Sequence, residues 1–336
     1  MSETLAVVGA GSWGTALANL LAKKGGAVRL WALEPEVVDG VNRSHENPLY
    51  LPGVALSPRL TASANLDEAV TGAELVVSVS PAQHVRSVMR QAGPAITPGA
   101  LIVSASKGLE KGTLATMAQV LRESLPAGLP VRTAYLSGPS FAAEVARELA
   151  TAVTVASESL EAATQAQARF QTPYFRVYTS GDVTGVELGG ALKNVIAIAA
   201  GMGVGLGLGH NATAALITRG LAEMSRLGQA LGADARTFSG LAGMGDLILT
   251  CTGELSRNRQ VGLELGRGRP LHEILAGMKS VAEGVDTTVA AHALARREGI
   301  EMPIVDAVHS VLFGGITARE ALEVLMQRQP KPEFWS

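Results

Sequence analysis

Residues 5–34, LAVVGAGSWGTALANLLAKKGGAVRLWALE, decide the fold of this chain. An apolar run leads into Gly9, Gly11 and Gly14, spaced G-x-G-x-x-G, and a helical stretch, a second apolar run and Glu34 follow. Glycines at this spacing permit a tight turn, close approach of backbone to a pyrophosphate, and close packing of the helix on the sheet. An acidic residue about twenty positions on is where a ribose 2'-hydroxyl is expected. The unit predicts a dinucleotide site; the alternative is a glycine-rich structural turn that binds nothing.

Length and charge limit what else the chain can do. Its 336 residues are enough for two domains, and the formal net charge of −2 provides no broad field that would attract nucleic acid. We therefore expect no nucleic-acid partner and expect any phosphate site to be a local pocket. The single cysteine, Cys251, excludes an internal disulfide and fits a reducing compartment. The N-terminus has no basic targeting region and no stretch approaches the length of a membrane span, so we expect a cytoplasmic protein without membrane insertion.

Further short apolar runs alternate with amphipathic stretches, a pattern typical of a largely parallel sheet wrapped by helices. The pattern stops after Ser180, and from Asp182 onward the sequence is rich in Ala, Leu and Gly at helical spacing. We therefore expect an α/β Rossmann-type domain in residues 1–180 and an all-α domain in residues 181–336, with the ligand in the crevice between them. The apolar runs occupy residues 75–80, 101–106, 133–137, 151–157 and 174–180.

The glycine run GMGVGLGLG, residues 201–209, interrupts the helical pattern of the second half. Glycine at this density thins or breaks a helix. Three interpretations stay open: close helix packing, a flexible turn capped by Asn211, or a mobile element over a substrate.

Two lysines are candidates for proton transfer. Lys193 lies in LGGALKNVIAIAAG, where small and aliphatic residues surround it, and burial or a nearby cation lowers a lysine pKa toward the value of a neutral-pH base. The alternative is a lysine that extends to a domain surface. Asn194 beside it either donates to a ligand or satisfies buried backbone. Lys107 directly follows the run LIVSAS, at the strand end that faces a ligand, where its charge would lower the pKa of Lys193; the alternative is a surface turn before Gly108.

Two segments place polar groups near strand or helix ends. YLSGPSFAAE, residues 135–144, offers Gly138 and the hydroxyl and amide of Ser140 to a ligand, or simply initiates a helix. GMGDLILTCT, residues 243–252, places Asp246 where it caps a helix, with Thr250 one turn later. Asp246 could also orient Lys193, although a carboxylate alone raises a lysine pKa, so burial and the second lysine must outweigh it.

The segment ELSRNRQ, residues 254–260, predicts a polar loop that suits a phosphomonoester. Arg257 presents a planar fork to two phosphate oxygens, and Ser256 and Asn258 add neutral donors; the alternative is a solvated basic loop. Cys251 is either a small core residue or a low-pKa nucleophile, and the aliphatic segment around it favours the core. The six histidines have no metal-ligand spacing, so we expect no metal; His210 stays conceivable as a general base.

Together, VVGAGSWGTALA, SKGLE, SGPSFAAE, GGALKNVIAIAAG, ALITRGLAEMSRLG, GMGDLILTCT and SRNRQ resemble the bacterial NAD(P)-dependent glycerol-3-phosphate dehydrogenases. The resemblance runs through nearly the whole chain, in the order and spacing of that family. It implies a helical second domain like that of 6-phosphogluconate dehydrogenase. It also implies reversible hydride transfer between dihydroxyacetone phosphate with NAD(P)H and sn-glycerol 3-phosphate with NAD(P)⁺, feeding phospholipid synthesis.

The resemblance also implies roles for individual residues. Lys193 would be the general acid/base at the C2 oxygen, and Lys107 and Asp246 would complete its polar network. With Asn194 and Thr250 included, the substrate set is Lys107, Gly138, Ser140, Lys193, Asn194, Asp246, Thr250, Ser256, Arg257 and Asn258. The cofactor set is Gly9, Gly11, Ser12, Trp13, Gly14, Glu34, Lys107, Ala142, Arg257, Val281 and Glu283.

One position departs from the family pattern. Many relatives carry His or Arg just before the acidic residue that ends the second strand, whereas this chain has Leu33 before Glu34. An arginine there would accept a 2'-phosphate and an acidic residue repels it, so we expect NADH to be used at least as well as NADPH. We also expect a homodimer, because the Ala- and Leu-rich helices of the second half suit an interface, although they equally suit an internal core.

Two other functions remain open at this point. A different enzyme of the same architecture would reduce another small oxo acid or use Cys251 to oxidise a sugar nucleotide. A non-enzymatic protein that senses NAD(P)H would have no need of Lys193 and Asp246.

Overall fold

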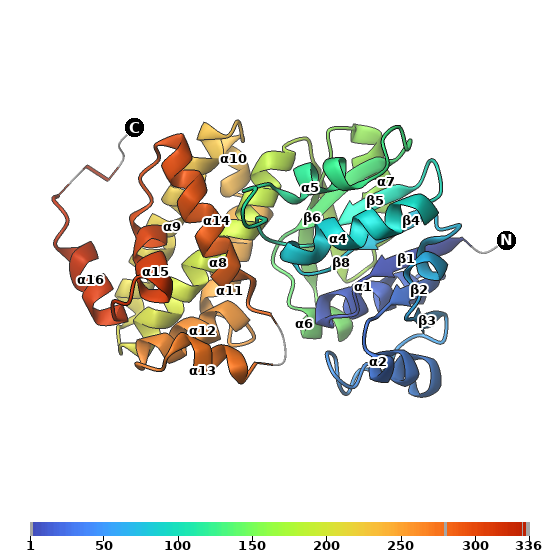
Figure 1. Cartoon of the computed structure of the whole chain (residues 1–336), viewed down its shortest axis with the longest axis horizontal. Coiled ribbons are helices and arrows are strands. Elements are labelled where there is room, and N and C mark those ends of the chain that lie inside the picture. Colours follow the sequence, from blue (N-terminus) through green and yellow to red (C-terminus); the bar gives the residue numbers. More distant parts are fainter. Residues whose placement is uncertain (1–2, 279–280, 331, 334–336) are drawn as a thin grey trace.

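The computed structural model describes residues 3–278, 281–330 and 332–333. A sheet and its helices form one end of the molecule and a helical half forms the other (Figure 1). The eight strands have the order β3-β2-β1-β4-β5-β6-β7-β8, and β6 and β7 pair antiparallel while the other neighbours are parallel. Their bounds are β1 Thr4–Val8, β2 Ala27–Trp31, β3 Leu60–Ser63, β4 Leu75–Ser78, β5 Leu101–Ser104, β6 Arg132–Ser137, β7 Thr151–Ala156 and β8 Phe175–Ser180.

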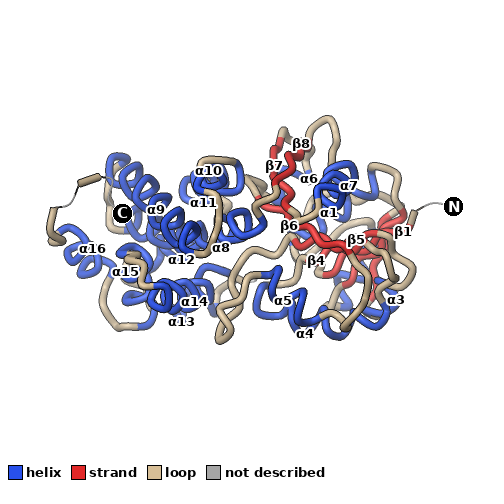
Figure 2. Tube along the Cα trace, turned by 90° about the horizontal axis from the view of Figure 1, so that it is seen from above, coloured by secondary structure: helices blue, strands red, loops and turns tan. Residues whose placement is uncertain are grey.

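Helices cover both faces of this sheet (Figure 2). Helices α1, α6 and α7 pack on one face and α3, α4 and α5 on the other, each over its own cluster of buried aliphatic side chains. The predicted α/β class is therefore confirmed. The helices are α1 Ser12–Lys23, α2 Pro35–Asp39, α3 Leu66–Val70, α4 Ala82–Ala92, α5 Met117–Ser124, α6 Ala142–Ala146 and α7 Leu160–Phe170.

One strand of the sheet was not predicted from the sequence. β3 has only four residues, Leu60–Ser63, and it lies at the edge of the sheet, where Thr61 is exposed. So short and half-polar a run has too little periodicity to be distinguished from a loop.

The glycine-rich turn after β1 has the predicted geometry. Gly9 has φ +118°, in the region that favours glycine, and a Cβ on Gly14 would overlap the carbonyl oxygen of Gly9. α1 then begins at Ser12 with Gly11 as its N-cap and without a side-chain cap. The first amides of α1 are therefore left for another partner.

The second half is built around α8, which α9, α11, α12 and α14 surround. By length and composition α8 could cross a membrane, contrary to our expectation that no such stretch exists. However, 83% of its most apolar window is buried, so in this structure α8 is the core of the helical half. The helices are α8 Val183–Gly205, α9 His210–Ala230, α10 Ala235–Phe238, α11 Asp246–Thr252, α12 Arg257–Gly266, α13 Leu271–Ala276, α14 Glu283–Glu298, α15 Pro303–Phe313 and α16 Ala318–Met326.

The glycine run serves close helix packing. α8 continues through it to Gly205, and a Cβ on Gly201 or Gly205 would overlap backbone of α12. The expectation of a turn capped by Asn211 is wrong, because α9 begins at His210 with Gly209 as its N-cap. The tight helix–helix contact involves the first part of the run, whereas Gly207 and Gly209 lie in the turn that follows α8 and have open space around them.

Candidate active site

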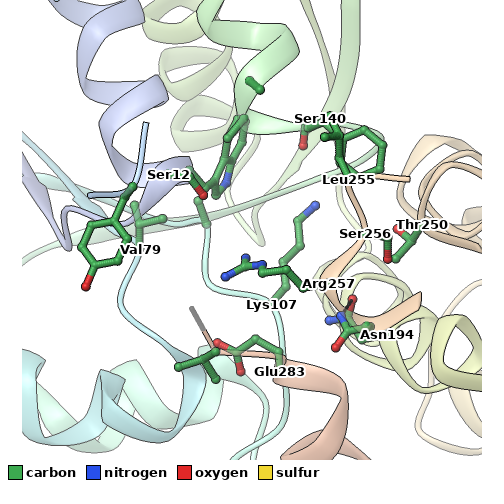
Figure 3. Close-up of a pocket in the computed structure, with 18 of the residues that line it drawn as sticks. Ser12, Val79, Lys107, Ser140, Asn194, Thr250, Leu255, Ser256, Arg257 and Glu283 are labelled. Atoms are coloured by element: carbon green, nitrogen blue, oxygen red, sulfur yellow. Dashed lines mark hydrogen bonds between the residues drawn. The ribbon is translucent and has the colours of Figure 1, made fainter. Parts of the chain in front are cut away.

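A pocket of about 470 Å³ lies between the carboxyl ends of the strands and the helical half. Ligands of open α/β sheets bind at this edge. In Figure 3, Lys107 and Arg257 project into the middle of the pocket, with Ser12 on one side and Asn194 on the other. The predicted residues that line it are Ser12, Trp13, Lys107, Ser140, Ala142, Lys193, Asn194, Asp246, Thr250, Ser256, Arg257, Asn258, Val281 and Glu283.

The other predicted residues lie just outside this lining. Gly9, Gly11 and Gly14 form the turn that starts α1, and Glu34 contacts the pocket through Tyr50. Gly138 contributes its carbonyl oxygen, which accepts a hydrogen bond from Lys107 Nζ at 3.0 Å.

Three charged side chains from three elements meet at the floor of the pocket. Lys193, on α8, and Lys107, after β5, place their Nζ atoms 2.9 and 2.8 Å from the two carboxylate oxygens of Asp246. Lys193 is 6% exposed and Asp246 only 1%. Lys193 therefore does not extend to the surface, and Lys107 is not a surface-turn lysine. One carboxylate holds two ammonium groups at fixed positions.

The environment of Lys193 suits proton transfer. Burial lowers its pKa to about 8; the charge of Lys107 acts in the same direction, and Asp246 opposes both. For Asp246, burial opposes ionisation, but the two lysines outweigh it and lower the pKa of the carboxyl group. An amine with a pKa near the working pH can both release and recover a proton.

Asp246 does not have the structural role that its sequence position predicts. It is the first residue of α11, the N-cap is Gly245, and no side chain caps this helix, so the capping prediction is wrong. Both carboxylate oxygens are turned to the lysines instead. Thr250 does lie one turn later: its hydroxyl donates to the Asp246 carbonyl oxygen at 2.6 Å and accepts from Lys193 Nζ at 2.9 Å.

Ser140 is free of the helix-capping role that was its alternative. α6 begins at Ala142 with Phe141 as its N-cap, and the Ser140 hydroxyl donates to the Gly138 carbonyl oxygen at 2.9 Å. Its oxygen keeps acceptor capacity toward the pocket that it lines.

The phosphate-type donors stand at a helix start, not in the polar loop that we predicted. α12 begins at Arg257, and the Ser256 oxygen accepts from the Arg259 amide at 3.2 Å, which leaves the serine proton for a ligand. Arg257 is exposed toward the pocket and makes no hydrogen bond or ion pair with any described residue. A helix N-terminus, an arginine and a serine hydroxyl together suit a phosphate dianion.

Two asparagines tie the helices behind this end of the pocket. Asn258 donates to the side-chain oxygen of Asn194 at 2.9 Å and accepts from the amide of Gly284 at 2.9 Å. α12, α8 and α14 are thereby joined through two buried amide groups. The amino group of Asn194 donates to the Gly190 carbonyl oxygen at 3.5 Å and keeps a second N–H for a ligand.

The end of the pocket next to α1 has hydrogen-bond donors that a ligand could use. Ser12 and Trp13 open α1, and the indole Nε1 of Trp13 is buried without a partner among the described residues. Beside them Tyr50 donates its hydroxyl proton to Glu34 at 2.8 Å. Leu33 is 71% exposed and brings no charge.

Glu283, at the start of α14, connects the two halves of the molecule. Its carboxylate accepts from the amide of Ala82, the first residue of α4, at 3.1 Å. Burial raises the pKa of this carboxyl group to about 7, against the Ala82 hydrogen bond and the charge of Arg257. Val281 lies two residues before it and is 47% exposed.

Residues 4–163 match the family model described as NAD-dependent glycerol-3-phosphate dehydrogenase N-terminus, and residues 182–323 match the model of its C-terminus. The chain belongs to this family. A Geobacter metallireducens protein named glycerol-3-phosphate dehydrogenase [NAD(P)+] is 58% identical, over 99% of each chain. A Syntrophotalea carbinolica protein of the same name is 56% identical, over 98% of this chain and 99% of that one. A solved glycerol-3-phosphate dehydrogenase structure from Coxiella burnetii has a TM-score of 0.93 at 41% identity, covering 97% of this chain and 99% of that chain.

The predicted resemblance to the glycerol-3-phosphate dehydrogenase family is therefore confirmed. The structure does not support the two alternative catalytic residues, a Cys251 nucleophile and a His210 general base. Cys251 is 1% exposed in the core, and burial raises its thiol pKa to about 12, so it is no nucleophile. His210 is exposed at the start of α9 and does not line the pocket. Within the part of the chain that the structure describes, no cluster of His, Cys, Asp and Glu could hold a metal ion.

Several residues of the lining in this family member were not predicted from the sequence, and two of them, Tyr50 and Arg147, carry polar groups that could contact a ligand. Tyr50 follows an irregular segment, and Arg147 follows α6; both line the α1 end of the pocket. Neither lies in a motif or beside a predicted strand end, so no local signal could have found them. Arg147 is exposed, and its guanidinium group makes no hydrogen bond or ion pair among the described residues.

Proposed function

We propose that this chain catalyses reversible hydride transfer between NAD(P)H with dihydroxyacetone phosphate and NAD(P)⁺ with sn-glycerol 3-phosphate. One observation carries the proposal: the Lys193–Asp246–Lys107 cluster lies in the same pocket as the phosphate-type donors of α12 and the start of α1. The full-length similarity to proteins named for this activity supports it.

The residues at the α1 end fit a dinucleotide. The uncapped start of α1 and the orphaned Trp13 Nε1 are donors that a pyrophosphate would satisfy. We infer that Ser12 and Trp13 hold the cofactor there and that Ala142, Val281 and Glu283 line its path. When bound, the cofactor supplies or accepts the hydride. The protein's own chemistry is to hold the substrate and to move one proton.

We assign that proton to Lys193 Nζ. During reduction the ammonium donates its proton to the C2 oxygen of dihydroxyacetone phosphate as negative charge develops there, and in the reverse direction the neutral amine takes it back. Asp246 and Thr250 fix the position of the amine, and Lys107 stabilises the same oxygen and helps keep the pKa of Lys193 low.

We assign the substrate phosphate to Ser256, Arg257 and the α12 N-terminus, with Asn258 and Asn194 holding the helices around it. Ser140 and the Gly138 carbonyl then border the carbon skeleton. A bidentate arginine contact explains why a phosphate, and not an uncharged alcohol, would be required.

The experiment that tests the activity follows the absorbance of reduced nicotinamide with dihydroxyacetone phosphate as the oxidant. We expect rapid oxidation of NADH, and much slower oxidation with dihydroxyacetone, which lacks the phosphate. Equal rates with the two ketones would contradict the anion-pocket assignment.

Cofactor choice is a separate proposal. Glu34 is held by Tyr50 and Leu33 carries no charge, which supports use of NADH at least as well as NADPH. We expect kcat/KM for NADH to equal or exceed that for NADPH. A large preference for NADPH would show that another cation, such as Arg147, accepts the 2'-phosphate.

Three broader inferences accompany the activity. We infer two domains, residues 1–180 and 181–336, since the last strand ends at Ser180 and α8 starts at Val183. We infer a homodimer formed through the helical half, where Val324 and Met326 of α16 are exposed, and sedimentation velocity would test it. We also infer a cytoplasmic enzyme, without membrane insertion or a nucleic-acid partner, that supplies glycerol 3-phosphate for phospholipid synthesis.

A further inference from the structure

A second, much smaller cavity lies behind the active site, where the sheet meets α8. It has a volume of about 10 Å³. Its walls come from the ends of β5 and β6, the stem of Lys107, and the first two turns of α8. None of its functional groups has a role in the chemistry described above except Lys107. The lining residues that matter below are Ser104, Ser137, Glu187 and Gly190.

Three oxygen atoms of this lining are buried without hydrogen-bond partners among the described residues. They are Ser104 Oγ, Ser137 Oγ and Glu187 Oε2. A buried polar atom that lacks a partner costs about 1–3 kcal/mol. Three such atoms around one cavity are therefore expected to share a partner that protein atoms do not supply.

Glu187 is held in place from its other side. Its Oε1 accepts from the amide of Ala118, in the first turn of α5, at 2.9 Å. That contact links α8 to the sheet half and leaves Oε2 as the carboxylate oxygen available to the cavity. Burial raises the pKa of Glu187 to about 7, and the Ala118 amide together with the nearby polar groups of Thr116 and Met117 acts in the opposite direction.

We propose that one buried water molecule occupies this cavity, bonded to Ser104, Ser137 and Glu187, and that it fixes Lys107 relative to α8. A cavity of about 10–15 Å³ is the smallest that holds a water, and a buried water makes about three hydrogen bonds. The water donates to Glu187 Oε2 and to one serine oxygen and accepts the proton of the other hydroxyl. All three orphaned atoms are then satisfied.

The location of this water connects it to the reaction. Gly190 lies one turn before Lys193 on α8, and a Cβ on Gly190 would lie 3.7 Å from Lys107 Cγ and 2.6 Å from Ser137 Oγ. The water thus lies between the segment after β5 that carries Lys107 and the turn of α8 that precedes Lys193. Glu187 acts as a positioning residue, because it holds the water and touches neither substrate nor cofactor.

The direct test is a high-resolution crystal structure of the unmodified protein. We expect one ordered water within hydrogen-bond distance of Ser104 Oγ, Ser137 Oγ and Glu187 Oε2. Absence of a water peak, or serine rotamers that pair with other protein atoms, would overturn the proposal. This readout does not depend on the proposed function, so the two can fail separately.

The functional test uses a matched pair of helix variants. Gly190→Ala places a methyl group in the cavity and excludes the water, whereas Gly203→Ala, on the same helix, meets only Leu208 Cδ1 at 3.7 Å. We expect Gly190→Ala to lower kcat about tenfold through misplaced lysines, with KM for dihydroxyacetone phosphate near wild type, and Gly203→Ala to leave kcat unchanged. Equal kcat for the two variants would contradict the positioning role.

A second pair of variants, at Glu187, tests the positioning role if the Gly190→Ala protein fails to fold. Glu187→Gln retains an oxygen and a hydrogen-bonding group toward the water, whereas Glu187→Leu has neither. We expect Glu187→Gln to retain most of the kcat and Glu187→Leu to lose it while NADH binding is retained. Loss of activity to the same extent in both variants would show that Glu187 acts through its charge and not through a water.

Discussion

The amine of Lys193 lies 2.9 Å from a carboxylate and still has a lowered pKa, because burial acts on it more strongly than the ion pair does. We expect Lys193→Ala to reduce kcat about 10²–10⁴-fold, the range that a general acid supplies. Affinity for NADH, measured by fluorescence, should stay near wild type. Lys111→Ala is the matched control, since Lys111 pairs with Asp286 at the surface. Turnover by Lys193→Ala close to wild type would remove the amine from the mechanism.

The same amine predicts the pH dependence. Reduction of the ketone needs protonated Lys193, so its rate should be full below pH 8 and fall as the pH rises through about 8. Oxidation of glycerol 3-phosphate needs the neutral amine and should rise through the same pH. Lys107→Met removes a cation that lowers the pKa of Lys193, so in this variant both limbs should move to higher pH. A shift to lower pH would contradict this assignment.

Arg257 is the residue whose loss should act on binding more than on turnover. Its hydrogen bonds to a phosphate are charge-assisted and worth about 1.5–3 kcal/mol, so Arg257→Ala should raise KM for dihydroxyacetone phosphate about tenfold to a hundredfold. We expect kcat to change little, because the contact is equally strong in the ground and transition states. Arg267→Ala, at the exposed far end of α12, is the control. An unchanged KM would place the phosphate elsewhere.

At the scale of the elements, the contact between α8 and α12 holds the pocket together. A Cβ on Gly262 would overlap the carbonyl oxygen of Ile198, so Gly262→Ala must push the two helices apart. We expect it to lower the free energy of unfolding by about 1–3 kcal/mol, as overpacking does. In the control Gly203→Ala the new methyl group would make only an ordinary van der Waals contact with Leu208, so this variant should be neutral or stabilising. Urea unfolding measures both, and equal midpoints would contradict the packing argument.

At the level of the molecule, the pocket lies between the sheet half and the helical half, and polar contacts that join the two halves surround it. Glu283 accepts from Ala82, and Lys111 pairs with Asp286 at 2.8 Å. A cofactor that contacts both halves should therefore stabilise the folded chain, by about 2.7 kcal/mol at a hundred times its Kd. We expect NADH to raise the melting temperature by several degrees. Adenosine, which lacks the pyrophosphate, is the control, and an equal shift with it would contradict the cofactor placement.

Sequence patterns located most of the candidate residues because many of them adjoin a recognisable end of an element, whereas Lys193 is a single charge in the middle of an apolar helix. Lys107 follows an apolar strand, Asp246 precedes an apolar helix, and Gly9 sits in a spaced glycine motif. The predictions that were wrong concern which hydrogen-bond or ion-pair partner a polar side chain takes. Asp246 was expected to cap a helix, yet two lysines from distant elements take its oxygens. A short stretch of sequence does not show whether a polar side chain will bond to the backbone of its own helix or to residues that are distant in the chain.

The alternation of strands and helices, the dinucleotide turn and the chemical types available to the site can all be predicted from the amino-acid sequence. These follow from periodicity and backbone sterics, which act over a few residues. Two contacts follow from the folded arrangement alone: Lys193 and Lys107 each pair with one carboxylate oxygen of Asp246, and Tyr50 donates a hydrogen bond to Glu34. Burial and charge act through space, so a lysine pKa near 8 belongs to the folded arrangement and to no segment of the chain.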